Sequence, residues 1–103
     1  MDMLEDYFGR RVRLTEERLR HILGHAEMAS LGPLLAETIA RPELVVESRS
    51  DGSAVLYYRL LRSSAFGVKW MCVVVKYRED DAFVLTAYLT DRPKKGNQLW
   101  PSM

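Results

Sequence analysis

Cysteine is nearly absent from this chain, since Cys72 is the single cysteine among 103 residues. One thiol cannot form a disulfide within the chain, and proteins without disulfides are typical of a reducing compartment. No apolar run approaches the roughly 20 residues that a membrane-spanning helix requires. The start, Met-Asp-Met-Leu-Glu-Asp, is acidic where a secretory leader is basic. We therefore expect a cytoplasmic protein that does not enter a membrane.

Several motifs of common enzymes are also missing. The chain contains no P-loop, no Gly-x-Gly-x-x-Gly, no Cys-x-x-Cys, no His-Glu-x-x-His and no Gly-x-Ser-x-Gly. Their absence removes most nucleotide-binding, zinc-enzyme and serine-hydrolase assignments. We accordingly expect neither a cofactor nor a metal ion.

Net charge is small but unevenly distributed. The total is +1; residues 1–50 hold 7 Lys or Arg and 9 Asp or Glu, a net of −2, whereas residues 51–103 hold 8 and 5, a net of +3. Local positive potential can bind a polyanion even when the total charge is near zero. Lys and Arg also protect exposed strand edges from aggregation. The local excess therefore leaves both a nucleic-acid partner and a solvated sheet edge open.

The residues that are present suit one globular domain, residues 1–103, with 48% hydrophobic side chains. Thr15 is a typical N-cap for a helix that runs to about Gly24, and Pro33 suits the first turn of a second helix that ends at Arg41. Four strand-like segments follow at 43–48, 54–61, 68–77 and 83–90. Short connections join antiparallel neighbours. We predict an α+β domain with two N-terminal helices packed on a four-stranded antiparallel meander sheet.

The last of these segments alternates between an apolar and a hydroxyl-bearing face. Phe83, Leu85, Ala87 and Leu89 alternate with Val84, Thr86, Tyr88 and Thr90. A three-residue turn at 79–81 would place Tyr77 opposite Phe83, Val75 opposite Leu85 and Val73 opposite Ala87. The predicted core comprises Leu19, Ile22, Leu23, Leu35, Ile39, Val73, Val75, Phe83, Leu85 and Ala87.

The hydroxyl-bearing face offers candidate phosphate ligands. Thr86, Tyr88 and Lys76 supply hydroxyls, a phenol and one cation. Arg59, on the preceding strand, adds a second cation if the turn between the strands places it on the same face. Such a set can hold a phosphodiester and stabilise the extra charge of its transition state. Threonine and tyrosine are also ordinary strand residues, so a plain sheet surface explains the same pattern.

Two further groups of residues could carry chemistry. His21 and His25 are four residues apart, which suits a pair of imidazoles that transfer protons near neutral pH. The helical wheel turns His21 away from the apolar stripe, which equally suits a solvated helix face. In the tail, cations and an aromatic ring could contact phosphates and stack a base, or could form a polar end that packs on the domain; these residues are Arg92, Lys94, Lys95 and Trp100.

Five segments carry a family resemblance: RLTEERLRHILGH, LLAETIARPELVVES, YYR, CVVVKY and FVLTAYLTDRPKKGNQLW. Over roughly residues 12–100 the chain resembles small phage- and bacteria-borne domains of the BECR nuclease superfamily, which are barnase-, EndoU-, colicin D- and RelE-like. The relevant branch is marked by a helical His-Ile, a His-Pro-Glu and a terminal Thr-Ala-Tyr followed by Lys-Gly. This chain has Ala26 where that pattern has proline.

The resemblance implies helices packed on a four-stranded antiparallel sheet and a metal-independent cleavage of RNA, in which the 2′-hydroxyl attacks the adjacent phosphate. It implies proton transfer by His21 and His25, phosphate binding by Arg59 and Lys76, and a site lined by Thr86 and Tyr88. Implied partners are RNA and an antitoxin or immunity protein.

A toxin-type or related endoribonuclease is thus our leading hypothesis. The alternatives are a non-catalytic module that binds RNA or protein through the same sheet face, and a homo-oligomer that pairs through Trp70, Val74 and Tyr88.

Overall fold

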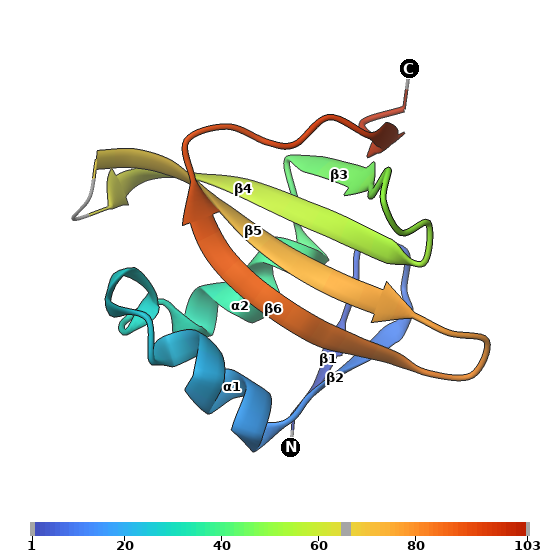
Figure 1. Ribbon diagram of the computed structural model, residues 1–103, viewed down its shortest axis with the longest axis horizontal. Coiled ribbons are helices and arrows are strands. Elements are labelled where there is room, and N and C mark those ends of the chain that lie inside the picture. The colour runs from blue at the N-terminus through green and yellow to red at the C-terminus, as the bar shows by residue number, and fades with distance from the viewer. Residues whose placement is uncertain (1, 65–66, 103) are drawn as a thin grey trace.

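One curved sheet dominates the protein (Figure 1). The computed structural model describes residues 2–64 and 67–102. Their elements are β1 (Asp2–Glu5), β2 (Arg11–Leu14), α1 (Glu16–Leu23), the 3-10 turn η1 (Ala26–Met28), α2 (Gly32–Ala40), β3 (Leu44–Glu47), β4 (Ala54–Ser64), β5 (Gly67–Tyr77), β6 (Ala82–Thr90) and β7 (Asn97–Trp100). The strands of these residues lie in the order β1-β2-β6-β5-β4-β3-β7. All neighbours are antiparallel except β2 and β6, which meet in parallel at Arg13 and Phe83.

The predicted four-stranded antiparallel meander is wrong, because the sheet of the described residues has seven strands and is mixed. The β1–β2 hairpin precedes both helices, so the helices do not begin the domain. Strand β7 comes from the tail and pairs with the outer edge of β3. Each of these three extra strands has four residues, which is too short for a period-two pattern to be distinctive.

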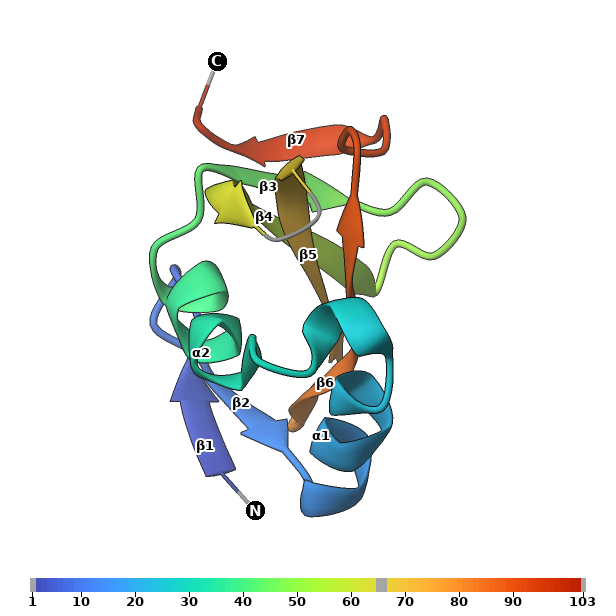
Figure 2. The same ribbon diagram turned by 90° about the vertical axis from the view of Figure 1, so that its left-hand side faces the viewer.

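The helices pack against one face of the sheet, as Figure 2 shows. Helix α1 begins where Thr15 accepts a hydrogen bond from the backbone N–H of Arg18, and α2 has Pro33 in its first turn. Helix α2 packs on β1, β4 and β5, whereas α1 and η1 pack beside β6. Between them lies the main core, which includes Ile22, Leu35, Ile39, Val73, Val75, Val84 and Ala87. No helix in the described residues is long and apolar enough to cross a membrane.

A bulge in β6 corrects the predicted register and core. Val73 lies opposite Ala87 as expected, but the pairing then slips, so that Val75 faces Val84 and Tyr77 faces Ala82. The predicted pairs Tyr77–Phe83 and Val75–Leu85 are therefore wrong. Leu85 is the bulged residue and has no partner on β5. Its side chain is 37% exposed, so its predicted burial is also wrong. Among the other predicted core residues, Leu19, Leu23 and Phe83 are half-buried and the rest are buried.

The β1–β2 hairpin is tied to the sheet by a buried carboxylate. Asp6 is 4% exposed and accepts hydrogen bonds from the backbone N–H groups of Phe8 and Arg10. It also accepts a 2.6 Å hydrogen bond from the Tyr77 hydroxyl, which is bonded in turn to the hydroxyl of Tyr57. One side chain thus holds the turn after β1 and links it to β5 and β4.

We predict that Asp6→Ala lowers the free energy of unfolding by about 3 kcal/mol, because it leaves buried donors without an acceptor. Urea denaturation followed by circular dichroism measures the change. Asp80→Ala, which removes an exposed carboxylate from the β5–β6 turn, is the control and should alter the unfolding free energy by less than about 0.5 kcal/mol. Equal effects of the two substitutions would contradict this role for Asp6.

Candidate functional site

The face of the sheet opposite the helices holds a cleft of about 430 Å³. A second apolar cluster lies beneath this open face and includes Tyr58, Cys72 and Val74. The floor of the cleft is mostly apolar, one wall is the turn between β3 and β4, and the other is the crossover from β6 to β7. The lining residues are Val46, Ser48, Arg49, Ser50, Asp51, Ala54, Leu56, Val74, Leu85, Thr86, Tyr88, Lys94 and Lys95.

The wall between β3 and β4 is shaped by Asp51. Its carboxylate accepts hydrogen bonds from the backbone N–H and the hydroxyl of Ser53, which closes the turn. It also forms an ion pair with Lys76 from β5. The ammonium of Lys76 and the two hydrogen bonds from Ser53 lower the pKa of Asp51 to about 2. Asp51 therefore remains a carboxylate at neutral pH, and the charge of Lys76 is compensated.

The opposite wall is the crossover segment, residues 91–96. Because β6 and β7 are separated in the sheet by β5, β4 and β3, this segment must pass over those strands (Figure 1). The backbone N–H of Lys94 donates a 3.0 Å hydrogen bond to the hydroxyl of Tyr58 on β4. The ammonium of Lys94 lies 6.0 Å from the ring centre of Tyr88 on β6. The crossover is thereby fixed above the open face.

The floor contributes neutral groups. Burial raises the pKa of Tyr58 and the pKa of Tyr88 above the usual range of a phenol, so both are neutral hydroxyls at physiological pH. Burial likewise raises the pKa of the Cys72 thiol to about 11, which keeps it protonated.

Three cations around the cleft have no acidic partner. Within the described part of the chain, the side chains of Arg49 and Lys95 make no hydrogen bond or ion pair, and Lys94 contacts an aromatic ring rather than a carboxylate. Among the described residues that line the cleft, Asp51 is the acidic one, and its carboxylate already forms an ion pair with Lys76. The cleft consequently has an excess of positive charge over an apolar floor, an arrangement that attracts a polyanion.

Comparison with known families identifies the domain. Residues 2–100 match the model of the phage-Barnase-EndoU-ColicinE5/D-RelE like nuclease2 family. The chain belongs to this family. Its membership supports a nuclease-type function and confirms the resemblance seen in the sequence. No curated protein and no solved structure matches the chain.

This nuclease-like domain brings together four of the residues singled out from its sequence. Thr86, Tyr88, Lys94 and Lys95 all line the cleft. Lys76 does not line it but forms an ion pair with Asp51, which does. Thr86 and Tyr88 keep the predicted face because the bulge lies immediately before Thr86.

Two tail residues of the nuclease-like domain lie elsewhere. Arg92 is exposed in the crossover, where its carbonyl accepts a hydrogen bond from the Thr90 hydroxyl. Trp100 packs on the helix-side core, and its ring centre is 4.6 Å from that of Tyr7 in the β1–β2 turn. Neither residue lines the cleft.

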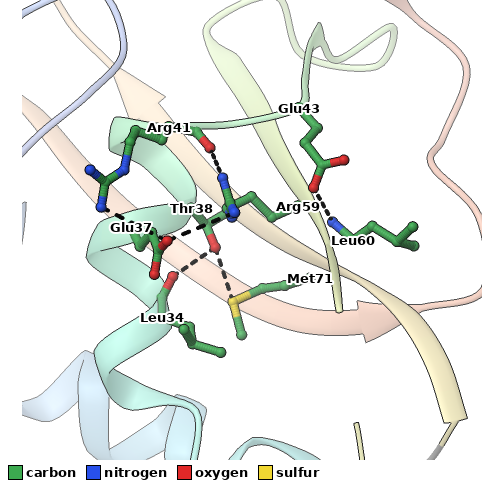
Figure 3. Close-up of polar contacts among 8 residues, drawn as sticks. All are labelled: Leu34, Glu37, Thr38, Arg41, Glu43, Arg59, Leu60 and Met71. Carbon is green, nitrogen blue, oxygen red and sulfur yellow. Dashed lines mark hydrogen bonds and ion pairs between the residues drawn. The ribbon is translucent and has the colours of Figure 1, made fainter. Parts of the chain in front are cut away.

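Arg59 lies on the helix side of the sheet, where Figure 3 shows it between β4 and the end of α2. Its guanidinium donates to the carbonyl oxygen of Arg41, the C-cap residue of α2, and lies 3.8 Å from the carboxylate of Glu37. Arg59 thus holds the C-terminal end of α2 against the sheet and is separated from Thr86 and Tyr88 by the sheet itself.

The two histidines are exposed and lie outside the cleft. His21 is in α1 and His25 follows it, and their ring centres are 5.7 Å apart in an edge-to-face arrangement. Helix α1 packs beside β6, the strand that carries Thr86 and Tyr88. The helix that carries the pair therefore packs on the face of the sheet opposite the cleft.

Sequence reasoning missed Arg49 and Tyr58. Arg49 is in a polar turn of serines and aspartate, and a turn carries no periodicity that assigns a side chain to a face. Tyr58 is in a predicted strand, but its partner Lys94 is 36 residues away, a pairing that spacing cannot reveal.

We predict that Lys76→Met raises the pKa of Asp51 from about 2 toward its ordinary value, because the substitution removes the largest cause of the depression while Ser53 remains. A depressed carboxylate pKa stabilises the fold above the unfolded-state pKa, and this stabilisation disappears as the pH falls toward 2. The substitution should therefore reduce the dependence of stability on pH in this acid range. Carbon-detected NMR titration of the Asp51 carboxyl measures the pKa directly.

The matched control is Lys69→Met, which removes the ammonium that pairs with Asp91. It should raise the pKa of Asp91 and leave that of Asp51 unchanged. An Asp51 titration that is identical in the wild type and Lys76→Met would show that the Ser53 turn alone sets the pKa.

Proposed function

We propose that this nuclease-like domain is a metal-independent endoribonuclease that binds RNA in the open-face cleft. In the proposed reaction, the 2′-hydroxyl attacks the adjacent phosphate and the 5′-oxygen leaves. The observation that carries the proposal is the set of cations without an acidic partner, Arg49, Lys94 and Lys95, around one cleft in a chain of a nuclease family.

The electrostatics of the cleft suit a phosphodiester. The phosphates of an RNA strand are negatively charged hydrogen-bond acceptors, so fixed cations and hydroxyl donors bind them favourably. Thr86 and Tyr88 supply hydroxyls beside the cations. The apolar floor, formed by side chains such as Leu56 and Leu85, can contact a ribose or a base. A floor of this kind supports a nucleotide ligand over a small inorganic anion.

Proton transfer needs a group outside the cleft. The carboxylate of Asp51, with a pKa of about 2, is a weak base, and the raised pKa of Tyr88 makes it a weak acid. Imidazoles titrate near neutral pH and can serve as either base or acid. We therefore keep His21 and His25 as the proposed acid–base pair. Because α1 lies on the other side of the sheet from the cleft, the phosphodiester that reaches the histidines would be a different one from that bound in the cleft. In this proposal the cleft anchors the RNA strand, and the strand continues around β6 to the histidines, where it is cleaved.

We predict that affinity for a single-stranded RNA oligonucleotide falls with salt, and that Lys94→Ala/Lys95→Ala reduces the magnitude of the log–log slope by about 0.7 for each phosphate that is no longer neutralised. Fluorescence anisotropy over a series of salt concentrations gives the slope. Arg11→Ala, which removes an exposed cation from β2, outside the cleft, should leave the slope unchanged. A wild-type affinity that does not respond to salt would exclude phosphate binding in the cleft.

We further predict that the wild-type protein cleaves total RNA in the presence of EDTA and that His21→Ala/His25→Ala cleaves it at least about 100-fold more slowly, with unchanged RNA affinity. Single-turnover cleavage of a labelled oligonucleotide measures both rates.

The outcomes separate the hypotheses. Equal cleavage rates for the wild type and His21→Ala/His25→Ala would exclude the histidines from the mechanism but would not affect the proposal that the cleft binds RNA. Salt-dependent binding without cleavage by the wild type would favour the alternative of a non-catalytic RNA-binding module on the same sheet face.

A further inference from the structure

The crossover that carries Lys94 and Lys95 is anchored at two points. The first anchor is Tyr58, whose side chain is fully buried in the open-face cluster and packs edge-to-face with Trp70 at a ring-centre distance of 6.3 Å. Its hydroxyl accepts the hydrogen bond from the backbone N–H of Lys94 at 3.0 Å. A rigid buried ring thus presents a single acceptor to the crossover above it.

The second anchor is Gly96. A Cβ atom at this position would lie 2.4 Å from the carbonyl oxygen of Glu47 and 2.5 Å from Cγ1 of Val46, both in β3. Distances that short cannot be accommodated without movement of the backbone, so the crossover approaches β3 as closely as glycine allows. Lys95 lies between the two anchors, and both lysines line the cleft.

Cations on a fixed segment bind an anion at a lower entropic cost than cations on a mobile one, because their positions need not be ordered on binding. Removal of the Tyr58 hydroxyl would release the backbone of Lys94 while leaving every charge of the cleft in place. The Tyr58 hydroxyl should therefore affect RNA affinity only through the positions of Lys94 and Lys95.

We propose that Tyr58 is a positioning residue, which fixes the crossover so that Lys94 and Lys95 meet RNA phosphates in the cleft. This inference rests on the proposed function of the cleft. Tyr58 itself contacts the crossover and not the substrate, so its role is indirect and can be separated from direct binding of a phosphate.

The test is a double-mutant cycle on RNA affinity with Tyr58→Phe and Lys94→Ala/Lys95→Ala. Tyr58→Phe keeps the buried ring and removes the hydroxyl alone. We expect it to weaken binding of a single-stranded oligonucleotide in the wild-type background and to have no effect once both lysines are absent. Tyr57→Phe is the matched control, because the hydroxyl of Tyr57 is bonded to Tyr77 on the helix side of the sheet. It should leave RNA affinity unchanged.

Gly96→Ala tests the same inference from the other anchor. It should also weaken RNA binding in a manner that depends on the two lysines. Thermal unfolding of each variant identifies any protein that is not folded at the assay temperature. RNA affinities are compared at a temperature below the lowest midpoint of thermal unfolding among the variants.

Each outcome of the cycle is decisive. If Tyr58→Phe binds RNA as the wild type does, while removal of the lysines weakens binding, Tyr58 is not a positioning residue. If Tyr58→Phe weakens binding equally with and without the lysines, it acts by another route and the inference also fails. If removal of the lysines has no effect on affinity, the cleft is not the RNA site and the proposed function fails instead.

Discussion

Between Val74 and Val75 the pairing of β5 with β6 slips by one residue, and Leu85 is left without a partner. In a regular strand Val84 and Ala87 would point to opposite faces, yet both are 2% exposed and belong to the helix-side core. The extra residue restores both to that core and turns Leu85 and Thr86 together toward the cleft. Helix packing and the lining of the cleft therefore depend on the same bulge.

The two faces of the sheet use positive charge in different ways. On the helix side Arg59 is matched with the end of α2 and with Glu37, so its charge serves the packing of a helix (Figure 3). On the open side Arg49 and Lys95 have no partner among the described residues. An uncompensated cation beside a cleft contributes little to folding and is available to a ligand. The grouping of such cations around one cleft is what marks the candidate site.

Local signals in the sequence were sufficient for the helices and for the central strands. Thr15 caps α1 as its hydroxyl and the following acids suggest, and Thr86 and Tyr88 lie on the open face as alternation predicts. The bulge could not be predicted, because residues 82–85 are all apolar and hide the change of phase that one additional residue makes in a pattern of period two. The face on which Arg59 lies could not be predicted for a related reason, since alternation tells which residues share a face but not which of the two faces the helices cover.

The outer strands β1 and β7 contain four residues each, and this shortness has a consequence for behaviour in a crowded solution. A sheet edge with unpaired backbone groups is a template on which another chain can add a strand. Here each edge offers few free donors and acceptors before the chain turns away, and Pro101 directly after β7 can donate none. At the two ends of the sheet, β1 and β7 therefore offer a neighbouring molecule only a short template for an added strand.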